Sequence, residues 1–235
     1  MAFSGIQDGY YDLLAELCLR NDKAFYEAAK PRFREAVLRP LQELVEALTP
    51  TVLGIDPAFG VRPNMGYAIS RVMRDARRVR GGSFYRDHMW ICFKIPAQET
   101  YTYPAFYCEF EQDGWGYGMG FYAPGADVMH ELRQLLLEDP QRGAEALESA
   151  RKAGFVPMGE RYRRLPAGEP DARVLPLFEL KSCFFAKETP GREGVTDPAL
   201  PQRIARDYEA LTPMYRLMKE AVVRAMIGKG EQMSW

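Results

Sequence analysis

The sequence is poor in cysteine and has no long apolar run. Its four cysteines are Cys18, Cys92, Cys108 and Cys183, and none belongs to a CxxC pair or shows metal-ligand spacing. Isolated cysteines inside apolar runs usually act as small buried hydrophobic residues, so a disulfide framework is not expected. No stretch of about 18 apolar residues is available for a membrane span. We therefore expect no association with a membrane.

Net charge is also nearly absent. The chain has 31 basic and 32 acidic residues, which gives a formal net charge of −1. No overall field attracts nucleic acid, so nucleic-acid binding is disfavoured and any charge-driven binding must be local. The first residues lack the basic segment and apolar stretch of a signal peptide. We expect a reducing, cytoplasmic location.

Motifs of known chemistry are missing as well. Residues 114–120, GWGYGMG, superficially resemble GxGxxG but are predicted to form a hairpin arm rather than a strand-to-helix turn. A metal site made from His88, His130 and acids such as Glu109 and Glu111 has no motif behind it, so we predict no metal and no cofactor. The sequence assigns neither a reaction class nor an oligomeric state.

Periodic apolar residues predict several helices. They cover residues 9–20, 124–137, 141–153 and 198–227. Between the first two of these, Asn21 and Asp22 cap a further helix, which continues from Pro31 to about residue 48. Residues 49–64 contain three prolines and read as an irregular connection. The tail, 228–235, is expected to fray.

Short runs rich in β-forming residues predict strands. They cover residues 67–72, 89–95, 103–111, 115–122 and 177–187. Asp113-Gly114 favours a tight hairpin turn, and Phe106, Cys108 and Phe110 alternate with polar residues as in an antiparallel strand with one buried face. We therefore predict an α+β fold: one domain over residues 1–235, with a central antiparallel β-meander sheet flanked by N-terminal and C-terminal helices.

A basic segment between two strand-like runs is the strongest functional signal. Residues 66–96 contain six arginines and one of the two histidines. Guanidinium groups bind phosphate and carboxylate bidentately, so Arg74, Arg77 and His88 are candidates to hold a small anionic ligand. Asp75 would orient one arginine, and Ser83 and Tyr85 would add hydroxyl groups. The other interpretation is a solvated surface paired with acids, which would suit a protein-interaction or scaffold module that meets an acidic partner.

Three stretches resemble a known family. Residues 21–30 (NDKAFYEAAK), 74–88 (RDARRVRGGSFYRDH) and 118–124 (GMGFYAP) resemble the motifs of the bacterial and fungal domain of unknown function 2461. Arg78, Gly81-Gly82 and Phe84 depart from the usual pattern. The resemblance covers nearly the whole chain, which implies one domain, and it adds Lys23 and Lys181 as basic residues of the candidate pocket. It implies no reaction.

Overall fold

The protein is represented by a computed structural model, which describes residues 3–75, 77, 81–95 and 103–228. The chain divides into two compact units. The first consists of Met1–Phe93, Tyr107–Tyr117 and Glu188–Ala205, and the second of Lys94–Phe106, Gly118–Lys187 and Arg206–Trp235. That the chain is one domain stays a prediction.

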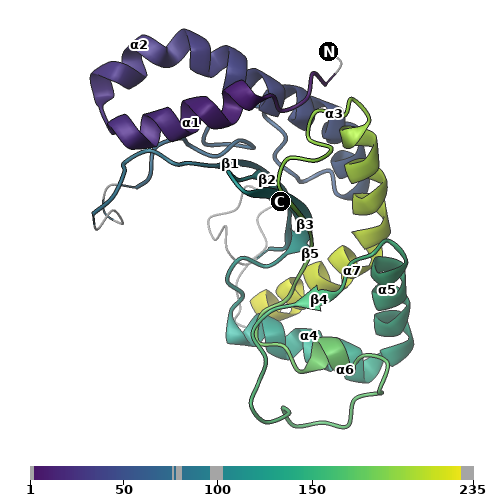
Figure 1. The fold of residues 1–235 in the computed structure, drawn as a ribbon. Helices are drawn as coiled ribbons and strands as arrows, with labels where there is room; N and C mark the ends of the chain where they lie inside the picture. Colours follow the sequence, from purple (N-terminus) through teal and green to yellow (C-terminus); the bar gives the residue numbers. More distant parts are fainter. Residues whose placement is uncertain (1–2, 76, 78–80, 96–102, 229–235) are drawn as a thin grey trace. The chain divides into compact units, whose positions relative to one another are not determined.

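The strands form one five-stranded antiparallel sheet in the order β1-β2-β3-β5-β4. Their bounds are Met89–Phe93 for β1, Ala105–Phe110 for β2, Gly114–Gly120 for β3, Pro157–Met158 for β4 and Phe184–Pro190 for β5. Strands β2, β3 and β5 each contain residues of both units. The sheet and the helices at both ends of the chain confirm the predicted α+β fold (Figure 1).

The central hairpin follows the predicted alternation. Phe106, Cys108 and Phe110 of β2 are fully buried, whereas Glu109 is half-buried. Strand β3 begins at Gly114, directly after the predicted turn residue Asp113. Glycines occupy alternate positions of β3, so one face of this strand carries no side chains. Glycine is required at Gly118, because a Cβ there would overlap the carbonyl group of Phe185. The predicted hairpin is confirmed.

The N-terminal helices belong to the first unit. They are α1 (Asp8–Arg20), α2 (Lys23–Phe33), the π-helical segment η1 (Arg34–Leu38) and α3 (Arg39–Ile55). In η1 the Arg39 N–H bonds to the Arg34 carbonyl group, a wider turn that carries the helix up to Pro40. The predicted helix end near residue 48 is wrong. Val52 is buried and Pro50 exposed, so packing of the last turn outweighs the hydrogen bond that Pro50 lacks.

Residues 67–72 do not form the predicted strand. Their sheet-like pairings are isolated bridges, from Ile69 to Met65 and to Ile91, and Met73 pairs likewise with Tyr85. The reason is a local turn: Gly66 has φ +83°, and the Ile69 N–H bonds back to the Asn64 carbonyl group at 3.2 Å. Backbone groups used in this turn are not free to continue a ladder.

The second unit contains α4 (Ala126–Glu138), α5 (Pro140–Lys152), α6 (Leu175–Phe178) and most of α7 (Leu200–Gly228) (Figure 1). The predicted strand over 177–187 is wrong in its first half, because Leu177 and Phe178 are buried on α6, which starts beside Pro176. Apart from Gly228, the predicted frayed tail lies outside the described residues.

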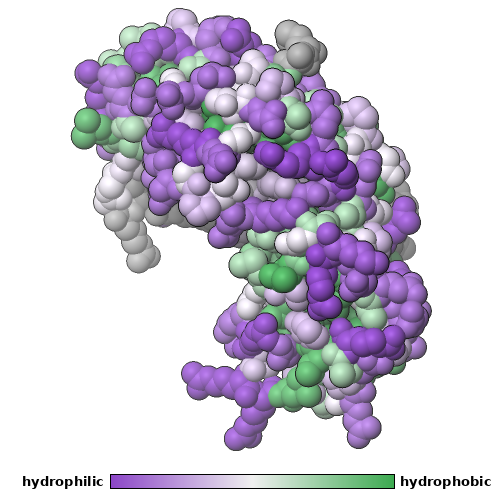
Figure 2. Space-filling view, turned by 45° about the vertical axis from the view of Figure 1, so that its right-hand side comes forward, coloured by the Kyte–Doolittle hydropathy of each residue, from purple (hydrophilic) through white to green (hydrophobic). Residues whose placement is uncertain are grey.

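The described surface is mostly polar on the side drawn in Figure 2, where apolar side chains occur in small separate patches. Among the described helices, none is long and apolar enough to cross a membrane.

Candidate functional site

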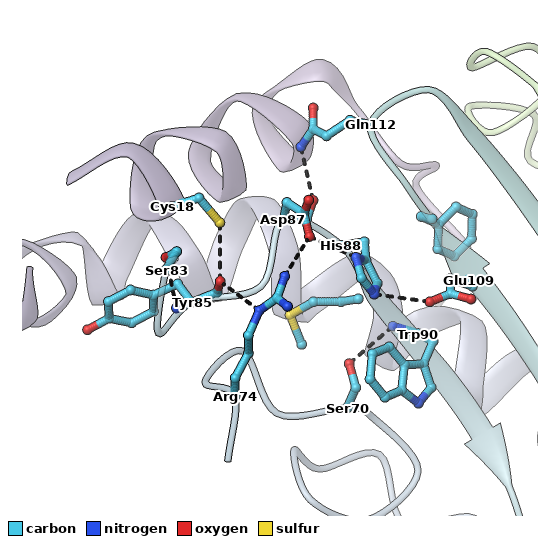
Figure 3. A network of polar contacts seen from close by, with 12 residues as sticks. Cys18, Ser70, Arg74, Ser83, Tyr85, Asp87, His88, Trp90, Glu109 and Gln112 are labelled. Carbon is cyan, nitrogen blue, oxygen red and sulfur yellow. Dashed lines mark hydrogen bonds and ion pairs between the residues drawn. The ribbon is translucent and has the colours of Figure 1, made fainter. Parts of the chain in front are cut away.

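Four charged or ionisable side chains of the first unit form one chain of contacts, which we call the Asp87 network. Arg74 Nη2 lies 3.4 Å from Asp87 Oδ1, and His88 Nδ1 lies 2.8 Å from the same oxygen. On its other side, His88 Nε2 lies 3.3 Å from Glu109 Oε1. Figure 3 shows His88 between the two carboxylates, with Arg74 approaching from the opposite side of Asp87. The network thus joins the basic segment to the sheet.

Strand alternation puts His88 and Glu109 on the half-buried face of the sheet. His88 precedes β1 and shares a face with Trp90, whose ring stacks on the imidazole with centroids 5.7 Å apart. The Arg86 guanidinium also lies over the Trp90 ring, 4.7 Å from its centroid. Glu109 occupies the corresponding face of β2, the neighbouring strand. Stacking restricts rotation of the imidazole ring and keeps both of its nitrogens directed at carboxylates.

Helix α1 fixes the alignment of β1 and β2 at this point. The buried Tyr10 hydroxyl accepts a hydrogen bond from the Met89 N–H at 3.0 Å and lies 3.2 Å from the carbonyl oxygens of Met89 and Phe110. Met89 follows His88, and Phe110 follows Glu109. Gln112 adds a second tie, since its side-chain amide donates to the carbonyl oxygens of Asp87 at 3.0 Å and Tyr11 at 3.1 Å.

The junction between α1 and α2 holds the loop that leads into the network. Asn21 ends α1 in the left-handed conformation, with φ 47°. Its side-chain oxygen accepts hydrogen bonds from the Phe84 N–H at 2.8 Å and the Ser83 hydroxyl at 3.3 Å. The Cys18 thiol donates to the Tyr85 carbonyl oxygen at 3.3 Å. The loop conformation therefore depends on contacts more than sixty residues apart in sequence.

Burial and neighbouring charges move the two network carboxyl groups in opposite directions. Burial raises the pKa of Asp87, but hydrogen bonds and the charges of His88 and Arg74 outweigh it and leave the pKa below its ordinary value. Burial also raises the pKa of Glu109; His88 and Arg86 oppose that rise, Glu111 adds to it, and the net shift is upward. The surroundings thus stabilise the ionised form of Asp87 and destabilise the ionised form of Glu109.

The structure brings four of the predicted residues to the network or beside it. Arg74 and His88 are members. Tyr85 contributes its carbonyl oxygen, 3.4 Å from Arg74 Nε, while its buried ring packs on Tyr26 with centroids 5.4 Å apart. Ser83 accepts a hydrogen bond from the Tyr85 N–H at 3.0 Å, so its hydroxyl shapes the loop.

The other predicted residues are engaged elsewhere. Arg77 forms a two-point ion pair with Asp75, and 89% of its side chain is exposed. Lys23 is exposed at the start of α2. Lys181 belongs to the second unit, where its ammonium group lies 2.7 Å from Glu160. Of the six arginines in residues 66–96, Arg78 and Arg80 lie outside the described residues.

Sequence reasoning missed Asp87 and Tyr10, and it discounted Glu109. One signal could have found Glu109. In an antiparallel pair, the polar face of 103–111 must lie beside the polar face of 89–95, which begins next to His88. The role of Asp87 had no comparable signal, because it depends on how the loop before β1 folds.

The comparison with family models gives a match over residues 10–217, to the family described as "Conserved hypothetical protein (DUF2461)". The chain belongs to the DUF2461 family. A comparison with curated proteins found no match. Within the DUF2461 region, the first two motifs of the sequence meet in space: Asn21 binds Ser83, and Tyr26 packs on Tyr85. Both contacts support the loop that carries the Asp87 network.

Proposed function

We propose that the protein binds a small anionic metabolite, bearing a phosphate or carboxylate group, at the Asp87 network. Arg74 carries this proposal. Its guanidinium is oriented by the Tyr85 carbonyl oxygen and by Asp87, and 43% of its side chain is exposed. Among the residues that the structure describes, none forms a hydrogen bond or ion pair with its Nη1. A positioned guanidinium with an available edge suits bidentate binding of an oxyanion.

The test is a thermal-shift screen with inorganic phosphate, AMP and succinate, run with and without added divalent cations. A ligand at about 100 times its Kd stabilises a protein by about 2.7 kcal/mol, which raises the melting temperature of a chain of this size by roughly 5–10 °C. Arg74→Ala should abolish that rise. Arg77→Ala is the matched control, because Arg77 is in the same segment but points to Asp75, and it should keep the rise. A wild-type protein that none of the three stabilises under either condition contradicts the proposal.

A protein-interaction role is the second candidate, and exposed apolar side chains of the first unit favour it. Leu19, Met73 and Phe84 are all exposed, and Phe84 adjoins the loop that Asn21 holds. Such residues beside exposed arginines suit a partner with acidic and apolar side chains. Fluorescence anisotropy with peptides rich in Glu and Leu tests it. Binding that Phe84→Ser and Arg77→Ala both weaken supports this role, and unchanged binding in both excludes it.

A further inference from the structure

His88, Glu109 and Glu111 lie together at one edge of the first unit. One ligand atom from each falls within 4.8 Å of the others. The contact of 3.3 Å between His88 Nε2 and Glu109 Oε1 is close to the separation of about 3.4 Å between two ligands of a tetrahedral ion bound at about 2.1 Å. Glu111 is exposed, so its side chain can turn by the small amount that coordination requires.

Both ring nitrogens of His88 face carboxylate oxygens. A neutral imidazole has one N–H, yet both nitrogens of His88 face carboxylate oxygens, at 2.8 Å from Asp87 and 3.3 Å from Glu109. The shorter contact suits an Nδ1–H that donates to Asp87. Nε2 then presents its lone pair to an anionic oxygen. A metal ion placed between Nε2 and Glu109 would be held by both of them.

We propose that His88, Glu109 and Glu111 bind a divalent first-row transition-metal ion, with Asp87 orienting the histidine. A carboxylate that accepts the second imidazole N–H is the usual companion of a metal-binding histidine, because it fixes the tautomer and the ring. One nitrogen and carboxylate oxygens suit Mn²⁺ or Zn²⁺ better than Ca²⁺ or Mg²⁺. Three protein ligands leave further coordination positions for a small molecule.

The sequence alone predicts no metal, and the reason is spacing. His88 and Glu109 are 21 positions apart, with no motif between them. They meet because β1 and β2 are neighbours and because Tyr10 binds the residue after each of them. Glu111 comes directly after the end of β2, two residues beyond Glu109. The ligand set is a product of strand pairing.

The charges around the network suggest that the metal ion and the anionic metabolite bind together. This coupling rests on the proposed function. The charged side chains in and beside the network include two arginines, Arg74 and Arg86, and three carboxylates, Asp87, Glu109 and Glu111. An anionic metabolite would meet a net negative site. A divalent ion reverses that balance, so anion and metal should bind with positive coupling.

The direct test is titration of EDTA-treated full-length protein with Mn²⁺ by calorimetry, and with Co²⁺ by visible absorption. We expect one ion per chain. His88→Ala and Glu109→Gln should weaken Mn²⁺ binding at least 10-fold, and Asp87→Asn by about 10- to 100-fold. His130→Ala is the matched control, since it removes the only other histidine, and it should bind as wild type does. Circular dichroism confirms folding of each variant, and the exposed Glu111→Gln keeps the test valid if a more buried variant does not fold.

Two results overturn the proposal. One is that wild type binds neither Mn²⁺ nor Co²⁺, and the other is that His88→Ala and Glu109→Gln bind Mn²⁺ as tightly as wild type does. The anion screen separates the two proposals. Metal binding without any anion effect refutes only the proposed function. An anion effect of equal size in Mn²⁺ and in EDTA refutes the coupling.

Discussion

Two acid–base contacts arise from the same basic segment, but they form in different ways. Asp75 and Arg77 are two residues apart, and their pair lies at the surface. The Asp87 network instead joins Arg74 and His88 to Glu109 on a neighbouring strand, and both His88 and Glu109 are half-buried. The first contact needs only a tripeptide. The second needs the loop, β1, β2 and α1 together.

A repeat elsewhere in the chain shows how local the first contact is. Asp171-Ala172-Arg173, in the second unit, has the same sequence pattern as Asp75-Ala76-Arg77. In both, the arginine N–H and Nε donate to one carboxylate oxygen and Nη2 to the other, at 2.8–3.1 Å. The Arg173 partner lowers the pKa of Asp171 to about 2. The Asp75–Arg77 pair is therefore a property of the tripeptide, and it does not by itself mark a binding site.

The largest effect should come from the residue that aligns the two strands. Tyr10→Phe removes the acceptor of the Met89 N–H and the donor to two carbonyl oxygens in a fully buried position. Such a loss costs about 1–3 kcal/mol, or roughly 2–10 °C in melting temperature. Because the alignment also positions His88 and Glu109, Mn²⁺ affinity should fall with it. Calorimetry measures both quantities.

Tyr11→Phe is the matched control on the next residue. The Tyr11 hydroxyl is also buried, but it has no hydrogen-bond partner among the described residues. Its removal should leave the melting temperature unchanged or slightly raised, because no partner is deprived. An equal loss of stability in Tyr10→Phe and Tyr11→Phe would show that the strand alignment does not depend on the Tyr10 hydroxyl.

The same contrast explains which parts of the molecule are predictable from sequence. The hairpin around Asp113-Gly114 and the helices over 9–20 and 141–153 depend on turn chemistry and periodicity within short windows, and the structure has them with ends shifted by a residue or two. Residues 67–72 and 177–187 were assigned to strands on composition. The structure instead gives 67–72 a turn with one isolated bridge to β1, and it places Leu177 and Phe178 on α6, so that only 184–187 of the second run lies in a strand.

The candidate site divides in the same way. Arg74 and His88 could be chosen from the sequence, because a run of basic residues before a predicted strand is a local pattern. Asp87 shares that segment, but its role depends on the two residues that reach it from either side. Glu109 and Tyr10 come from other elements. Without the pairing of β1 with β2, no spacing connects them to His88.

A smaller effect, with the opposite sign, should come from Glu109. Burial raises its pKa, so the folded state holds the proton more tightly than the unfolded state. At pH above the folded pKa the charged group destabilises the metal-free protein, and that cost diminishes as pH falls through the folded pKa. Glu109→Gln should therefore raise the melting temperature in EDTA at pH 7.5 by about 1–3 °C, a figure kept low for partial exposure.

Melting curves of wild type and Glu109→Gln between pH 7.5 and 5 check the sign. The advantage of the variant should shrink as pH falls. Glu46→Gln is the control: Glu46 is exposed on α3 in the same unit, and its variant should follow wild type at every pH. A Glu109→Gln protein less stable than wild type at pH 7.5 would mean that the ionised carboxylate stabilises the apo fold.

The smallest effect should come from the two Asp-Ala-Arg pairs. Arg77→Ala and Arg173→Ala each remove an exposed contact between residues two apart, where solvent screens the charges and the unfolded chain can form the same pair. Both variants should melt within about 1 °C of wild type, and Arg77→Ala should retain full Mn²⁺ affinity. Arg173 also donates to Gln141 at 2.6 Å, so any measurable loss should appear in Arg173→Ala first. A larger loss in Arg77→Ala would show that Arg77 has contacts that matter beyond its own tripeptide. Arg77 would then have to be grouped with the Asp87 network rather than with the local Asp-Ala-Arg pairs.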